Sequence, residues 1–164
     1  MDIGVRQLTP EDWQLLRSIR LRALADAPDA FGSTLGREEL FEEADWRARL
    51  AAHHGPVLLA TDGHTLAGIV RSFTDGSERT VVNLVGMWVA PEHRGSGVGS
   101  RLLDAFVDST RSEGRIAVRL TVVESNEPAR RLYGRHGFVE TGETESHPKG
   151  GAVELVMVRY LDGT

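Results

Sequence analysis

The chain contains no cysteine among its 164 residues. Internal disulfides, thiolate metal sites and covalent catalysis through a thiol are therefore excluded. No apolar run approaches the roughly 20 residues that a membrane-spanning helix needs. The first residues, MDIGVRQLTPEDW, lack the basic and apolar regions of a signal peptide. We therefore predict a cytoplasmic protein without membrane association.

Positive charge is also in the minority, because the chain has 19 Lys and Arg against 24 Asp and Glu, which gives a net charge of −5. This balance argues against nucleic-acid binding, which usually needs a basic stripe. The length and the 40% hydrophobic content predict one soluble domain over residues 1–164. The six histidines include no pair with metal-ligand spacing on a predicted helix face, so we predict no metal. The sequence leaves open whether the protein is a monomer or a homodimer.

The first half of the chain predicts two helices and four strands. Residues 2–8 alternate apolar and polar side chains, as strands do. Thr9 and Pro10 suit the start of a helix that runs to about residue 25. A second helix, continuous or broken, is predicted over residues 38–53. Three strands rich in Val, Leu and Ile follow at 57–61, 66–73 and 81–89.

The second half predicts a helix at 97–112, a strand at 116–123, a helix at 127–136 and closing strands at 138–143 and 153–160. Residues 144–151 are predicted to form a polar loop. The order is β-α-α-β-β-β-α-β-α-β-β, an α+β fold with a mixed sheet of about seven strands and four helices. The sheet is predicted to be antiparallel at its start, with one parallel crossover through the helix at 97–112.

A glycine-rich turn, RGSGVG at residues 94–99, precedes that helix. The first amides of a helix lack partners and its dipole adds positive potential, so such a turn can bind an anion. Arg94 can add a charge-assisted hydrogen bond. The dinucleotide fingerprint fails because the third glycine comes one residue early, and the nucleotide P-loop fails because Ser100 and Arg101 follow Gly99. The turn by itself fits a ligand loop and a structural turn equally well.

A second pattern, N-x-x-A-x-x-L-Y-x-x-x-G-F, is met by Asn126, Ala129, Leu132, Tyr133, Gly137 and Phe138. With both motifs in this order over residues 87–138, the chain resembles the GCN5-related N-acetyltransferases (GNAT). The order of predicted elements resembles that fold over nearly the whole chain. The resemblance implies an N-acetyltransferase that moves an acetyl group from acetyl-CoA directly to an amine.

The resemblance also implies roles for individual residues. Tyr133 would protonate the departing thiolate, and Asn126 would contact the pantetheine arm of CoA. The strand before the glycine turn would pair with that arm and supply a main-chain donor for the oxyanion, through Met87, Trp88 and Val89. The following strand would splay away and leave a slot for the thioester. The CoA pyrophosphate would lie against Arg94, Gly95, Ser96, Gly97, Val98, Gly99 and Ser100.

The sequence does not settle which group accepts the proton of the amine. Some protein N-terminal acetyltransferases of this family carry a glutamate twelve residues before the tyrosine, where this chain has Thr121. This difference disfavours that subclass. The remaining candidates are a water chain or one of Glu38, Glu39, Glu42 and Glu124.

The acceptor is predicted to bind near the first two helices and the late loop. Their many acidic residues suit a cationic amine. Phe31, Glu38 and Trp46 are predicted to line this pocket, although Phe31 and Trp46 fit a core role equally well. The leading hypothesis is acetylation of a small primary amine, such as a polyamine, an antibiotic or an amino-acid derivative. The alternatives are a protein N-terminal or lysine acetyltransferase and a non-catalytic acyl-CoA sensor.

Overall fold

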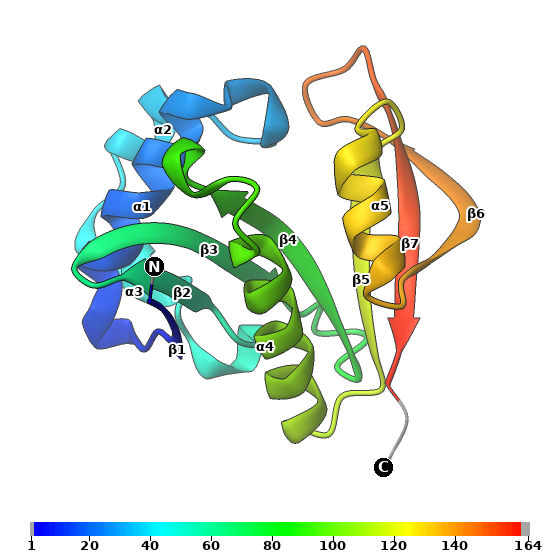
Figure 1. The fold of residues 1–164 in the computed structure, drawn as a ribbon, viewed down its shortest axis with the longest axis horizontal. Helices are drawn as coiled ribbons and strands as arrows, with labels where there is room; N and C mark the ends of the chain where they lie inside the picture. Colours follow the sequence, from blue (N-terminus) through cyan, green and yellow to red (C-terminus); the bar gives the residue numbers. More distant parts are fainter. Residues whose placement is uncertain (1, 162–164) are drawn as a thin grey trace.

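Seven strands form one mixed sheet in the order β1-β2-β3-β4-β5-β7-β6, within residues 2–161, which the computed structural model describes (Figure 1). All neighbouring strands are antiparallel except β4 and β5, which are parallel. The predicted mixed sheet of seven strands and its single parallel crossover are therefore confirmed. The strands are β1 Ile3–Gln7, β2 Leu58–Asp62, β3 Thr65–Phe73, β4 Val81–Val89, β5 Ala117–Val123, β6 Val139–Ser146 and β7 Val153–Tyr160.

Helices pack on both faces of this sheet. Side chains alternate along a strand, so Val70 of β3 joins the apolar cluster beneath the fourth and fifth helices, while Ile69 joins the cluster beneath the first three. Figure 1 shows the three N-terminal helices beside β1 to β3 and the fifth helix beside β5 and β7, while the fourth helix lies in front of the sheet and packs on β1 to β4. The helices are α1 Trp13–Asp26, α2 Leu35–Glu39, α3 Glu43–Ala48, α4 Val98–Ser112 and α5 Glu127–Arg135.

Two predicted elements differ from the structure. The helix expected at 38–53 is divided into α2 and α3, because Glu42 is extended and caps the start of α3 through a capping box with Asp45. The described residues therefore contain five α-helices rather than four. Strand β6 continues to Ser146, since residues 144–146 pair with Leu155, Glu154 and Val153 of β7. The prediction of a loop from residue 144 was wrong.

Strands β4 and β5 pair over only part of their length. The ladder joins Val81–Leu84 to Ala117–Leu120, but β4 continues to Val89 and β5 to Val123. The register of β4 against β3 also shifts, because Arg71 lies opposite Gly86 while Ser72 lies opposite Leu84, which leaves Val85 as a bulge. The strands therefore separate in the middle of the sheet, as the sequence predicted.

A buried ion-pair cluster holds the N-terminal helices together. The Glu38 carboxylate accepts hydrogen bonds from Arg20 Nε and Nη2, both at 3.0 Å, and from Arg49 Nη1 at 2.9 Å. Glu38 is fully buried. Burial by itself would raise the pKa of Glu38, but Arg20, and then Arg49 and Ser33, outweigh it and lower the pKa to about 2. The cluster thus joins α1, α2 and the segment after α3 through one charged carboxylate.

We expect Glu38→Gln to lower the free energy of unfolding by about 3 kcal/mol at pH 7, because it leaves buried Arg20 without a counter-ion. Urea unfolding would measure this, and Glu39→Gln, on the exposed neighbour, should change little. The pKa of Glu38 is about 2 in the folded protein and 4.5 as the unperturbed value. The difference between wild type and Glu38→Gln should therefore persist above about pH 4.5 and shrink as the pH falls toward about 2. A difference that stays constant across this range would contradict the assignment.

Candidate active site

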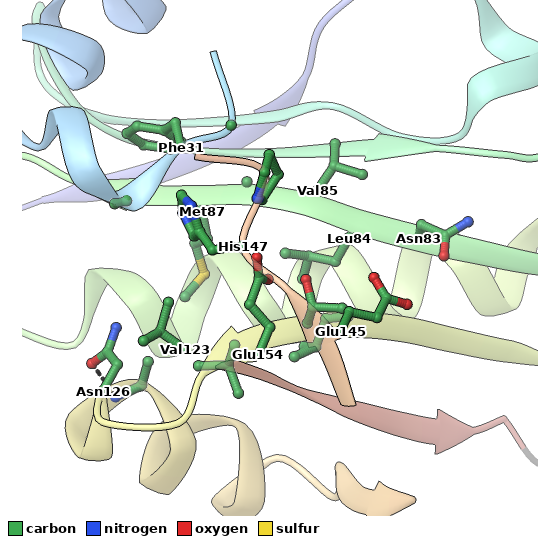
Figure 2. A pocket seen from close by; sticks show the side chains of 18 of the residues that line it. Phe31, Asn83, Leu84, Val85, Met87, Val123, Asn126, Glu145, His147 and Glu154 are labelled. Carbon is green, nitrogen blue, oxygen red and sulfur yellow. Dashed lines mark hydrogen bonds between the residues drawn. The ribbon is translucent and has the colours of Figure 1, made fainter. Parts of the chain in front are cut away.

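A cavity of about 540 Å³ opens where β4 and β5 separate. Its walls come from both strands, at residues 83–87 and 119–123. Residues 30–32 close it on one side, and α5 and the β6–β7 connection close it on the other. Figure 2 shows the side chains that line it. The cavity therefore sits in the middle of the sheet and is reached by segments that lie far apart in the sequence.

The glycine turn forms an open cradle at the start of α4. Gly95 and Gly97 have φ angles of +76° and +87°, and a Cβ built on either residue would meet no atom within 4 Å. Gly97 is the N-cap of α4 and provides no side chain to satisfy the first helical amides. The Ser96 hydroxyl donates to the His93 carbonyl and tightens the turn. This arrangement leaves main-chain donors facing open space, as binding of an anion requires.

Arg94 anchors this turn to the end of α1. Its Nε donates to the Val89 carbonyl at 3.0 Å, and its Nη2 forms an ion pair with Asp26. Trp88 Nε1 donates to the same carboxylate at 2.9 Å. The hydrogen bonds from Trp88 and Arg94 lower the pKa of Asp26. Arg94 therefore positions the turn, while about half of its side chain remains exposed beside it.

Met87, Trp88 and Val89 lie on the part of β4 that has separated from β5. The Trp88 side chain is buried in the cluster under α1, whereas Met87 lines the cavity. Beyond Leu84 this edge of β4 has no strand partner within residues 2–161. Apart from the Val89 carbonyl, which accepts from Arg94, the main-chain groups on this edge can pair with an extended ligand, as in strand addition.

The second motif lies on the opposite wall of the same cavity. Asn126 accepts a hydrogen bond from the Ala129 amide at 3.3 Å, which caps α5, and both residues line the cavity. Tyr133 follows on α5, is 8% exposed, and meets Phe138 edge-on at 5.8 Å. Burial raises the pKa of Tyr133 to about 12, so the phenol stays protonated near neutral pH. The structure therefore places Asn126, Tyr133 and Met87 around one space.

Among the three residues predicted to line the acceptor pocket, only Phe31 borders the cavity. Its ring lies 4.6 Å from the Arg20 guanidinium carbon. Glu38 is enclosed by its two arginines, and Trp46 is fully buried among apolar side chains. Glu39, Glu42 and Glu124, the other predicted bases, are also absent from the cavity lining. Glu38, Glu39, Glu42 and Glu124 thus lie elsewhere, and among the acids of the acceptor segments Glu145 alone lines the cavity within residues 2–161.

Four ionisable residues line the cavity: Arg119, Glu145, His147 and Glu154. Glu145 and His147 belong to the late segment that was expected near the acceptor, whereas Arg119 and Glu154 were not expected in the site. Arg119 and Glu145 form an ion pair. The signal that could have identified Glu154 is a glutamate inside the apolar strand sequence VELVMV. The segment that carries Glu145 and His147 looked like a solvated loop, so their position depended on the pairing of β6.

Two loops meet over the acceptor end of the cavity. A Cβ added to Gly32 would lie 3.1 Å from Pro148, and Lys149 Nζ donates to the Pro28 carbonyl. The segment after α1 therefore contacts the β6–β7 connection and encloses this side of the cavity.

A family model described as the acetyltransferase (GNAT) family matches residues 20–138. The chain belongs to this family. It is an acetyltransferase that uses acetyl-CoA as its acyl donor, and its open glycine cradle fits the diphosphate of that donor. Within residues 2–161, no three His, Asp or Glu side chains are grouped as a metal site, and no described helix is long and apolar enough to span a membrane.

Several relatives are 31% identical to this chain over the matched residues, and two of them are as follows. The uncharacterized N-acetyltransferase YhfO of Bacillus subtilis matches over 101 residues, which is 60% of this chain and 68% of that protein. The L-amino acid N-acyltransferase MnaT of Escherichia coli matches over 93 residues, which is 54% of this chain and 52% of that protein. The match therefore spans about half of MnaT.

Solved structures share the whole fold. A GNAT acetyltransferase from Streptococcus pneumoniae superimposes with a TM-score of 0.82 at 22% identity, covering 98% of this chain and all of that one. The structure of YncA from Salmonella typhimurium with acetyl-CoA gives 0.77 at 20% identity, covering 99% and 95%. At these identities the likeness establishes the GNAT fold.

Proposed function

We propose that this GNAT enzyme acetylates a primary amine on a small molecule. The observation that carries this proposal is the closure of the acceptor end, where Gly32 packs on Pro148 and Lys149 reaches Pro28. A protein terminus or a lysine side chain on a folded partner needs an open groove. A cavity of about 540 Å³ beneath joined loops has the size of a small-ligand site.

The name of one relative agrees with this choice of acceptor. MnaT is an L-amino acid N-acyltransferase, so its acceptor is a small molecule. An amino acid or a compound of similar size is therefore the first acceptor class to test with this chain. Thr121, in place of the glutamate expected in some protein N-terminal acetyltransferases, supports the same choice.

The donor is proposed to bind along the main chain from β4 to α4. The amides of residues 95–100 would hold the diphosphate, because glycines and an uncapped helix start leave donors free. The unpaired edge of β4 at residues 87–89 would pair with the pantetheine arm, and Asn126 would face that arm from α5. A main-chain amide on the same edge would stabilise the oxyanion.

Tyr133 is proposed as the general acid for the departing thiolate. Its phenol lines the cavity and remains protonated because burial raises its pKa to about 12. Its hydroxyl donates to no acceptor within residues 2–161, so it is available for a sulfur atom in the slot. The proton moves to sulfur as the carbon–sulfur bond breaks, which prevents the thiolate from attacking the new amide.

A screen of acceptors tests the proposed function. We expect acetyl-CoA with a panel of amino acids, polyamines and aminoglycosides to release thiol, with at least one compound giving kcat/KM above about 10⁴ M⁻¹s⁻¹. Peptides with free N-termini or lysines should be poor acceptors because the joined loops exclude them. Faster turnover of a peptide than of every small amine would overturn the choice of acceptor.

Gly97→Glu should abolish acetyl-CoA binding in calorimetry, since it places a carboxylate where the diphosphate would lie and forces a left-handed backbone on a residue with a Cβ. Gly63→Glu is the matched control. Gly63 also has a positive φ, +60°, with open space around it, but it lies in the β2–β3 turn. The control should bind acetyl-CoA as wild type does. Undiminished binding by Gly97→Glu would disprove the placement of the diphosphate.

Tyr133→Phe should lower kcat by about 100-fold and leave the Kd for acetyl-CoA nearly unchanged, because only the proton donor is lost. Because the pKa of Tyr133 is about 12, the activity of wild type should show no loss from phenol ionisation up to about pH 10. Tyr160→Phe, on the exposed residue of β7, serves as the control. Full kcat in Tyr133→Phe would remove Tyr133 from the mechanism.

A further inference from the structure

We propose that Glu154 is the general base that takes the proton from the acceptor amine. The identity of the acceptor follows the proposed function above, but the role of Glu154 depends only on the acetyl transfer itself. Glu154 lies on β7 and lines the cavity, with 9% of its surface exposed. Figure 2 shows its carboxylate projecting from β7 toward β4, into the space between the separated strands.

The alternation of side chains places Glu154 on the face of the sheet opposite Tyr133. Leu155 and Met157 of β7 pack in the apolar cluster under α4 and α5, together with Tyr133. Glu154 therefore points to the other face, and so does Val123, which lies directly beside it on β5. The Tyr133 phenol, on the face covered by α4 and α5, and the Glu154 carboxylate, on the other face, thus border the cavity between β4 and β5 from two sides.

Every other ionisable group on the acceptor side is already engaged. The Glu145 carboxylate is paired with Arg119. The Lys149 amide donates to His147 Nδ1 at 3.1 Å, so in neutral His147 this nitrogen is the acceptor and the proton sits on Nε2. The Nε2 position then has no lone pair to offer an amine.

Glu154 forms no side-chain hydrogen bond or ion pair with any residue in the range 2–161. With no partner in that range, the Glu154 carboxylate can accept from a group that enters the cavity. An incoming ammonium group suits it, because it brings an opposite charge and donors to the carboxylate. The charged and titratable groups that border the same space are Arg119, Tyr133, Glu145 and His147.

The proton transfers balance across the two faces. The ammonium of the acceptor first loses one proton to the Glu154 carboxylate, which passes it to solvent. The nitrogen lone pair then forms a bond to the thioester carbon, and the carbonyl π pair moves to oxygen. Glu154 takes the remaining extra proton from nitrogen. The carbonyl re-forms as the carbon–sulfur bond breaks, its electron pair stays on sulfur, and Tyr133 protonates that sulfur. Glu154 later releases its proton to solvent, from which Tyr133 recovers one.

The test is Glu154→Gln, assayed with whichever acceptor wild type turns over fastest. We expect kcat at pH 7 to fall by about 100-fold or more. In the variant, kcat should then rise about tenfold per pH unit between about pH 7 and 9, as solvent takes over the proton transfer. The melting temperature and the Kd for acetyl-CoA should stay as in wild type. Glu143→Gln, on an exposed β6 residue outside the cavity lining, should retain the rate and pH profile of wild type.

Glu154→Asp separates catalysis from folding, because it keeps a carboxylate on a shorter side chain. It should show an intermediate kcat with the pH profile of wild type. A wild-type rate and pH profile in Glu154→Gln would overturn the proposal, and so would equal losses in both variants without a change in pH dependence. If the best acceptor proves to be a peptide, the small-molecule function fails, while the same comparison on that peptide still decides the role of Glu154.

Discussion

The separation of β4 from β5 is the constraint on which the rest of the site depends. Parallel strands normally stay paired to their ends, because each unpaired main-chain group must find another partner. Here pairing stops at Leu84 and Leu120, and the bulge at Val85 turns β4 away. Beyond Leu84, the main-chain groups on this edge of β4 therefore have no strand partner at the centre of the sheet within the described part of the chain. In the proposed donor site, the pantetheine arm pairs with this edge of β4 as an added strand.

The turn before α4 follows the end of β4 and also leaves main-chain groups without partners among the described residues. Left-handed Gly95 and Gly97 let the chain reverse without side chains that would fill the cradle. Arg94 and Trp88 then fix the turn to Asp26 at the end of α1. The donor site is therefore held by contacts from both halves of the chain, although its binding groups come from one short segment.

The two motifs that carry the proposed donor side could be predicted from the sequence, because they follow local rules. A glycine turn before a helix, and an asparagine cap seven residues before a tyrosine, remain recognisable without knowledge of the tertiary structure. The acceptor side could not, because it depends on long-range pairing. Glu38 was expected in the acceptor pocket as a candidate base, yet Arg20 and Arg49 enclose it. Residues 144–146 looked like a loop, yet their pairing with β7 carries Glu145 into the cavity. Composition counts acids but does not show which of them are already paired.

In the proposed mechanism, a slot that passes through the sheet also separates the two proton transfers of the reaction. One face carries the helices α4 and α5, with the buried phenol of Tyr133, and the other carries the carboxylate of Glu154. With Glu154 as the proposed base and Tyr133 as the proposed acid, no single group has to act as both within one turnover. Direct transfer through such a slot needs no covalent enzyme intermediate, which agrees with a chain that contains no cysteine. The same geometry explains why the acceptor can change within one fold: the donor face is set by the sheet and α4, whereas the acceptor face is closed by loops whose sequence is free to vary.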